Sequence, residues 1–321
     1  MKKFTLYNLF YKKRDELEDL PNEDKTPTVK RFFKLFGRYF WKIVSLNLMM
    51  LVMVIPFLIA VFLYFGIDKT PSAYNPVFAQ LYGANLIHSS AESTLLMDLF
   101  GAQYMIPAYH STGTYIGIGI CILFAVVTFG WQNVGCTYIL RSLVRGEPPF
   151  LIADYFYAIK RNWKQGLAMG LLDAAVLFFL FFNISLYWDM LGSFFNDFMF
   201  YANSALLILY FFMRFYIYHL LITFELSVRK ILKNALIFVT LGIKRNLMAA
   251  LGMLIFTAMS ILLVALSIYM FGLNSIPIPV LLVLFIYMGA TAFMSSFAAY
   301  PIIERYMITP FQSKDEEPEE I

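Results

Sequence analysis

The chain has 321 residues, of which 60% are hydrophobic and only 14% are charged. Ordinary soluble domains are about 45–50% apolar and about 25% charged, so a soluble fold of this length could not bury so much apolar surface. The formal net charge of +4 reflects basic loops that are offset by acidic segments, so we infer no nucleic-acid partner. The composition predicts an all-α polytopic membrane protein that lies in a lipid bilayer.

Six apolar segments are long enough to cross a bilayer, which takes about 20 residues. In chain order they cover residues 43–65, 115–143, 167–188, 196–224, 247–271 and 277–303. Consecutive segments pair into three hairpins. We therefore expect six transmembrane helices, with both ends of the chain on the same side of the membrane.

Polar segments flank and interrupt the six-span membrane domain, which covers residues 28–305. Residues 1–27 are expected to form a flexible cytoplasmic segment and residues 306–321 an acidic cytoplasmic tail, because both are rich in charge and terminal. The loop 67–114 is expected on the external side. Asp98 interrupts its apolar character, so we predict no seventh span there.

Lys and Arg residues are distributed unevenly between the two sides of the predicted membrane domain. Of the 25 in the chain, eleven precede or begin the first span, and five lie in each of the links 141–164 and 225–245. The external loop 67–114 contains only Lys69. Loops rich in Lys and Arg stay in the cytoplasm, so the pattern predicts a multi-pass protein with both termini cytoplasmic.

A short amphipathic segment precedes each odd-numbered span. The segments at 28–40, 150–163 and 232–239 place apolar side chains at helical spacing. Such helices lie in the membrane interface, where the apolar face enters the headgroup region and basic side chains meet anionic lipid. The residues that we expect to anchor them at the cytoplasmic boundary are Arg38, Trp41, Lys42, Lys160, Arg161, Trp163, Lys164, Lys244 and Arg245.

These segments suggest a threefold internal repeat, in which an interfacial helix is followed by a hairpin of two spans. Every copy has the same orientation, so any symmetry would run along the membrane normal. The tripeptide Lys-Arg-Asn occurs at 160–162 and at 244–246, which we take as corresponding places. The alternative is that each inner membrane boundary attracts Lys, Arg and Trp independently.

Four polar residues are expected near the middle of the bilayer. Asp173 lies ten residues after Trp163, which is about 15 Å along a helix. Arg214 lies eleven residues before Glu225, or about 16 Å, and Gln132 and Asn133 reach a similar depth. Ionisable groups are costly at this depth. We therefore predict an ion pair of Asp173 with Arg214, with Gln132 or Asn133 nearby.

This midplane polar layer has two interpretations. It could bind a substrate or an ion, because transporters often place such sites near the bilayer midplane. It could instead hold spans together, because a paired charge and side-chain amides form bonds between helices. We favour the second interpretation. Nearby, we interpret His219 as a boundary or packing residue and favour this over a proton relay. The spacing of Gly166 and Gly170 would allow a close helix approach.

No motif in the sequence indicates catalysis. The patterns HExxH, GxSxG and Walker A do not occur. The two cysteines, Cys121 and Cys136, are about 22 Å apart on one predicted helix, and no Cys/His spacing typical of a metal site is present. We expect a protein that is not an enzyme and that uses neither a metal nor another cofactor.

Three stretches carry a resemblance to a known family: FFKLFGRYFWK at 32–42, TYILRSLVRGE at 137–147, and the run from Asp154 to Gly166 that ends in Asn-Trp-Lys-Gln-Gly. With a weaker match at 233–236, they make the chain similar to the YesL family of bacterial integral membrane proteins. The resemblance covers roughly residues 30–305.

The resemblance implies a place in the bacterial cell membrane and a link, through gene neighbourhood, to carbohydrate ABC transporters. Two features depart from the family pattern: the long 67–114 loop, and residues 133–135, where a Gly-Pro pair is expected. The family supplies no catalytic residue to transfer to this chain.

Two functions follow as expectations. The first is a non-catalytic accessory or assembly partner of a carbohydrate ABC uptake system, with the permease or the ATPase subunits as partners. No loop of the EAA type, with which an ABC permease docks its ATPase, is found in the sequence. The alternative is a stand-alone small-solute transporter or channel that uses the midplane polar site.

Overall fold

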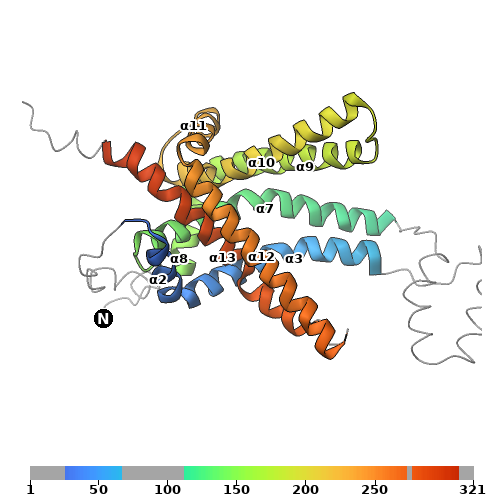
Figure 1. Ribbon diagram of the computed structural model, residues 1–321, viewed down its shortest axis with the longest axis horizontal. Helices are drawn as coiled ribbons and strands as arrows, with labels where there is room; N and C mark the ends of the chain where they lie inside the picture. Colours follow the sequence, from blue (N-terminus) through green and yellow to red (C-terminus); the bar gives the residue numbers. More distant parts are fainter. Residues whose placement is uncertain (1–25, 67–111, 273–276, 311–321) are drawn as a thin grey trace, which may run out of the picture. The chain divides into compact units, whose positions relative to one another are not determined.

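The computed structural model describes residues 26–66, 112–272 and 277–310 (Figure 1). All the regular structure in these residues is helical. Nearly all of the predicted segment 1–27, most of the loop 67–114 and most of the tail 306–321 lie outside the described residues. The statements below concern the described residues.

Six long helices account for most of the described chain. They are α3 (Phe40–Gly66), α7 (Thr112–Arg145), α9 (Trp163–Trp188), α10 (Phe194–Thr223), α12 (Ile243–Phe271) and α13 (Pro277–Ile303). Each contains one of the predicted spans, because a backbone in lipid must satisfy its own hydrogen bonds and a helix does so within one segment. A π-helical turn, η3 (Glu304–Ile308), follows α13.

The prediction of an all-α polytopic membrane protein is confirmed. Five of the described helices are long and apolar enough to cross a membrane. The number becomes six if Val29–Arg38 and Phe40–Val52, which are bent by 74° from each other, count as one broken span. The first predicted span, 43–65, lies in α3, and the bend separates it from the amphipathic segment before it.

Three short helices precede three of the long ones: α2 (Val29–Arg38), α8 (Leu151–Arg161) and α11 (Val228–Leu241). One residue separates each short helix from its long helix, and the backbone there is alike in all three places. The φ and ψ angles are −105° and 16° at Tyr39, −115° and 23° at Asn162, and −98° and 11° at Gly242. All three lie in the sparsely populated bridge region. This shared break favours a true internal repeat over the alternative, in which each inner membrane boundary attracts Lys, Arg and Trp independently.

The same breaks correct one detail of the predicted repeat. Asn162 is itself a break residue, whereas Asn246 lies four residues beyond the break at Gly242 and is buried inside α12. The tripeptides at 160–162 and 244–246 therefore do not occupy corresponding places. Lys and Arg are frequent near every break, so a three-letter match among them is a weak guide to register.

The short helices are attached to the long ones by buried side chains. Thr28 caps α2, because its Oγ1 accepts a hydrogen bond from the Arg31 backbone N–H at 3.2 Å. The ring of Tyr155 in α8 occupies the space beside Gly135 of α7, where a Cβ atom would lie 2.4 Å from it. Burial raises the pKa of the Tyr155 hydroxyl, so it stays neutral. Each short helix thus has one face packed against the bundle.

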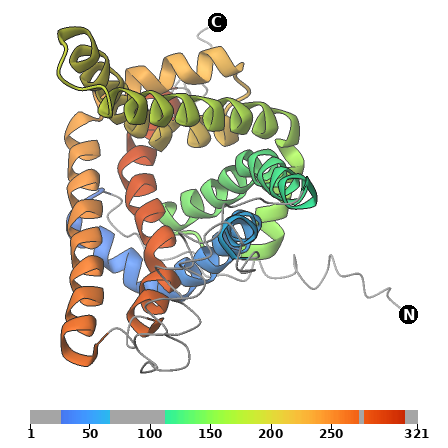
Figure 2. The same ribbon diagram turned by 90° about the vertical axis from the view of Figure 1, so that its right-hand side faces the viewer.

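The chain divides into two compact units, of which the larger contains residues 1–53 and 127–321 and the smaller 54–126. Within the smaller unit, the end of α3 packs against the start of α7, where a Cβ at Gly117 would lie 3.3 Å from Leu63 Cδ1. Within the larger unit, α9 lies beside α10 and α12 beside α13 (Figures 1 and 2).

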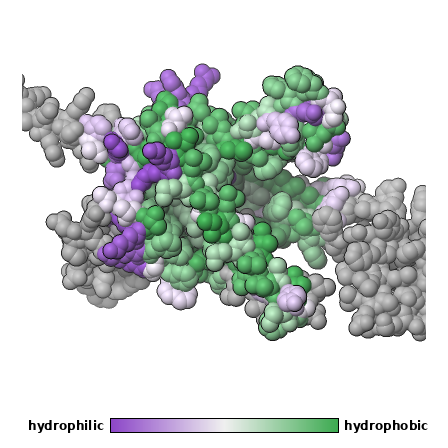
Figure 3. Space-filling view, in the orientation of Figure 1, coloured by the Kyte–Doolittle hydropathy of each residue, from purple (hydrophilic) through white to green (hydrophobic). Residues whose placement is uncertain are grey.

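The buried core of the larger unit gathers at the ends of the long helices that adjoin α2, α8 and α11. Fully buried side chains there include Leu35, Leu143, Tyr155, Tyr216 and Ile231. Much of the surface along the long helices is apolar, while hydrophilic side chains gather around α2, α11 and the end of α13 (Figure 3). An exposed apolar surface of this kind is typical of a protein that contacts lipid.

Candidate functional site

Asp173 of α9 lies at the centre of the candidate site. Its side chain is completely buried, with 0% exposure. An isolated ionised carboxylate is very unfavourable in such an apolar place unless other groups pair with it and donate hydrogen bonds to it. The surroundings of Asp173 therefore decide what this residue does.

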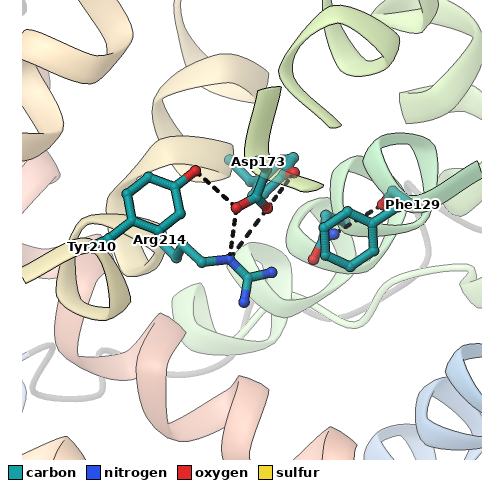
Figure 4. Close-up of polar contacts among 6 residues, drawn as sticks. Phe129, Asp173, Tyr210 and Arg214 are labelled. Atoms are coloured by element: carbon teal, nitrogen blue, oxygen red, sulfur yellow. Dashed lines mark hydrogen bonds and ion pairs between the residues drawn. The ribbon is translucent and has the colours of Figure 1, made fainter. Parts of the chain in front are cut away.

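Three side chains of α10 donate to this carboxylate. The Tyr210 hydroxyl lies 2.8 Å from Oδ1 and the Tyr218 hydroxyl 2.9 Å from Oδ2. Arg214 Nε lies 3.2 Å from each oxygen and completes an ion pair. Figure 4 shows Tyr210 and Arg214 directed at the carboxylate of Asp173. We call these four residues the Asp173 cluster.

The local cause of this arrangement is helical spacing. Residues 210, 214 and 218 are four positions apart, so their side chains lie on one face of α10, and that face is turned to α9. The structure brings together the pair of Asp173 and Arg214 that the sequence predicts. Tyr210 and Tyr218 were missed, although their four-residue spacing on either side of Arg214 was a signal that could have found them.

The Arg214 guanidinium extends beyond the ion pair towards α7. Its Cζ lies 5.5 Å from the centroid of the Phe129 ring, a cation–π contact. The side chain is 28% exposed, and its two Nη groups form no hydrogen bond with the described residues. Arg214 is thus the one member of the cluster that the surroundings of the protein can reach.

The two predicted amide residues do not join the cluster. Gln132 Nε2 donates to the Met50 carbonyl at 3.1 Å, which links α7 to α3. Asn133 Nδ2 donates to the Phe129 carbonyl at 2.8 Å, one turn earlier in α7. The four residues predicted for one polar layer therefore form one ion pair and two separate backbone contacts.

Helix α7 reaches the neighbourhood of Asp173 through a contact of glycines. A Cβ at Gly170 would lie 2.3 Å from Gly130 Cα, and a Cβ at Gly130 would lie 2.0 Å from the Gly166 carbonyl oxygen. Only glycines allow two helices to approach so closely. The contact places Phe129, the neighbour of Gly130, beside Arg214. Its partner on α7, Gly130, was not identified from the sequence.

Two further buried amides were also missed. Asn47 of α3 donates to the Leu284 carbonyl at 2.6 Å and accepts from the Gly289 backbone N–H at 2.8 Å, so it joins α3 to α13. Asn246 of α12 accepts from the Tyr216 hydroxyl at 2.7 Å and so joins α12 to α10. Each single amide resembles an ordinary polar interruption of an apolar run, which gives no signal of its partner.

His219 of α10 is buried beside the ring of Tyr300, with 6.5 Å between the ring centroids. Its Nδ1 atom forms no hydrogen bond with the described residues. The contact with Tyr300 packs this part of α10 against α13. This geometry agrees with the packing role that we inferred from the sequence.

The predicted interfacial anchors are mostly exposed, as side chains at a membrane boundary would be. Trp41 is 77% exposed. Lys42 and Arg245 are half-buried, since Lys42 Nζ donates to the Pro149 carbonyl at 3.2 Å and Arg245 Nη2 to the Pro27 carbonyl at 2.7 Å. The other exposed anchors are Arg38, Lys160, Arg161, Trp163, Lys164 and Lys244.

The chemistry of the Asp173 cluster is that of a closed ion pair. Both carboxylate oxygens accept hydrogen bonds from the protein, and the side chain has 0% exposure. Within residues 26–66, 112–272 and 277–310, no group of three or more His, Cys, Asp and Glu residues is placed to hold a metal ion. In comparisons with known proteins, no family model, no curated protein and no solved structure matched the chain.

Proposed function

We propose that the protein is a non-catalytic membrane protein that serves a carbohydrate ABC uptake system as an accessory or assembly partner. The observation that carries this proposal is the burial of the Asp173 carboxylate, whose donors all come from the protein. This carboxylate has 0% exposure and receives three donors from α10. A transport site must open its polar groups to a ligand, whereas this carboxylate has already used them on the protein.

The energetics of the cluster favour a role in holding helices together. Breaking a buried ion pair by removing one partner is costly, because the other charge is left buried and unpaired. Asp173 on α9 and Arg214 on α10 are such a pair, and two tyrosine hydroxyls reinforce it. The polar groups at membrane depth are thereby explained without a substrate.

Helix α11 offers a surface for a partner. One of its faces is buried through Ile231, Ala235 and Phe238. Its other face exposes several basic side chains, together with the apolar side chains of Leu236 and Ile237. The exposed basic residues of α11 are Arg229, Lys230 and Lys233. A mixed basic and apolar face suits a membrane surface or the cytoplasmic part of another membrane protein.

The resemblance to the YesL family directs this proposal to carbohydrate uptake. It supports a permease or an ATPase subunit as the partner and a bacterial cell membrane as the location. The distribution of Lys and Arg supports cytoplasmic termini. In that orientation α2, α8 and α11 lie on the side of the membrane where an ABC transporter carries its ATPase.

Affinity purification of the full-length protein from its native membrane in a mild detergent tests the proposal. We expect a carbohydrate permease or ATPase at near-stoichiometric yield. The triple variant Arg229→Gln, Lys230→Gln, Lys233→Gln should lose it. A matched variant that removes three charges elsewhere, Lys160→Gln, Arg161→Gln, Lys164→Gln, should keep it. Recovery of neither subunit with the wild-type protein would refute the accessory role.

A stand-alone transporter is the second candidate, and one observation favours it: the Arg214 guanidinium is partly exposed at the depth of the predicted midplane. Purified protein in liposomes provides the test. Uptake of a labelled sugar by the wild-type protein alone, lost in Arg214→Leu, would replace the accessory proposal with this one. Absence of uptake, together with recovery of a permease or an ATPase, would support the accessory role.

A further inference from the structure

An apolar groove of about 420 Å³ lies in the larger unit, where α2, α12 and α13 meet. The wall formed by α12 contains Arg245, Ala249, Gly252, Phe256 and Met259. These residues recur every three or four positions, so they lie along one face of the helix. All are apolar except Arg245, which lies near the start of α12. The groove therefore has one cationic end and an apolar body.

The cationic end contains a hydrogen-bond donor that has no partner among the described residues. Arg245 Nη2 donates to the Pro27 carbonyl at 2.7 Å. Arg245 Nη1 is buried and forms no hydrogen bond with the described residues. Of the residues that the structure describes, no Asp or Glu lines the groove. A buried cationic donor without an acceptor is unfavourable, and an anion at this end would satisfy it.

The length of the groove fits one leaflet of a bilayer. From Ala249 to Met259 the α12 wall runs about 15 Å, which is half of a hydrocarbon core about 30 Å thick. Arg245 lies four residues nearer the start of the helix, so it is about 6 Å beyond the apolar part. A cation at that distance lies at the level where lipid phosphates lie.

We infer that this groove binds an anionic phospholipid, with one acyl chain along the α12 wall and the phosphate accepting a hydrogen bond from Arg245 Nη1. Three methionines, Met248, Met259 and Met294, line the apolar body. Their unbranched side chains adapt to a flexible hydrocarbon chain. This site is independent of the proposed link to an ABC transporter.

A larger side chain in place of Gly252 would fill the groove without a change at Arg245. A Cβ at this position would meet only Met294 Sδ, at 3.6 Å, which is ordinary van der Waals contact. The helix can therefore accept a side chain here, and the bulk of a leucine would occupy the groove. Gly252→Leu tests the acyl part of the site, and Arg245→Gln tests the phosphate part. Arg245→Gln also alters the contact with Pro27, so the glycine variant is the cleaner of the two.

Each variant has a matched control. Arg305→Gln removes an exposed cation of η3 that does not line the groove. Ala265→Leu adds the same bulk to an exposed position of α12 outside the groove. A thermal unfolding curve of each variant shows that it is folded before binding is measured.

The experiment is native mass spectrometry of the full-length protein in mild detergent, titrated with dioleoyl phosphatidylglycerol. We expect one lipid to be retained by the wild-type protein. Loss of a charge-assisted hydrogen bond should weaken binding by at least about tenfold in Arg245→Gln. Gly252→Leu should weaken it at least as much, and both controls should bind like the wild type.

Three outcomes would overturn the inference. The first is equal retention of phosphatidylglycerol by the wild type, Arg245→Gln and Gly252→Leu. The second is competition by free glycerol phosphate at the concentrations at which the lipid binds, because the acyl chain would then be irrelevant. The third is a protein dimer that separates in Gly252→Leu while lipid retention is unchanged, because a second copy would then occupy the groove.

Discussion

The Asp173 cluster and the Arg245 groove each place an arginine among apolar helices, but Arg214 faces a carboxylate, whereas the described lining of the groove contains none. Arg214 is paired with a carboxylate to which two tyrosines also donate. Arg245 faces a groove with no acidic residue and has a buried Nη1 without a partner in the described part of the chain. A buried charge that the chain itself satisfies stabilises the fold, whereas an unsatisfied donor beside open apolar space indicates a ligand.

Removal of the Asp173 carboxylate should have the largest effect on the stability of the protein. In Asp173→Ala, the Arg214 charge and two hydroxyls lose their acceptor inside the bundle. We expect the free energy of unfolding to fall by about 3–5 kcal/mol, measured by equilibrium unfolding in mixed detergent micelles. Asp189→Ala, at the exposed end of the same helix, should change it by less than about 0.5 kcal/mol. A stability of Asp173→Ala equal to that of the wild type would show that the cluster is not part of the scaffold.

The second-largest effect is expected at the contact of Gly170 with Gly130. A change there should affect helix packing and leave lipid binding unchanged. Gly170→Ala would place a Cβ 2.3 Å from Gly130 Cα, so α7 and α9 must move apart. We expect a loss of about 3 kcal/mol in the free energy of unfolding, with phosphatidylglycerol retention by the folded protein unchanged. At Gly119, in α7, a Cβ would meet no atom within 4 Å. Gly119→Ala should therefore be neutral or stabilising by up to about 1 kcal/mol, and an equal loss in both variants would contradict the glycine contact.

A smaller effect tests the tyrosine donors. Tyr218→Phe removes one hydrogen bond to the carboxylate and keeps the ring, so we expect a loss of about 2 kcal/mol in the free energy of unfolding. Tyr201→Phe on the same helix is the control, because Tyr201 is 67% exposed and belongs to neither site. Tyr218 would have no structural role at Asp173 if the two variants unfolded alike.

The smallest effect comes from the groove. Phosphatidylglycerol at roughly ten times its dissociation constant should raise the free energy of unfolding of the wild-type protein by about 1.4 kcal/mol, because it binds only the folded state. Gly252→Leu should show no such increase in a thermal unfolding assay, whereas Tyr218→Phe should keep it in full. An equal increase in Gly252→Leu would place the lipid elsewhere on the protein.

Part of the candidate site was visible in the sequence. The depths of Asp173 and Arg214 follow from a constant rise per residue, and the cost of burying a charge makes a pair the expected solution. The tyrosines required knowledge of which face of α10 meets α9. Gln132 and Asn133 show the limit of the depth argument, since they lie at a similar predicted depth yet bond to backbone carbonyls and not to Asp173.

By itself, the sequence determined the class of the protein and the places of its long helices. Those features depend on local chemistry, because about 20 apolar residues in lipid form a helix whatever their neighbours do. Only the tertiary structure decided the partners of Tyr210 and Asn246 and the close approach of Gly130 to Gly170. It also decided which residues form the three breaks between short and long helices, and where the groove at Arg245 lies. These depend on the rotation of each helix about its axis, which is decided by contacts between helices far apart in the chain.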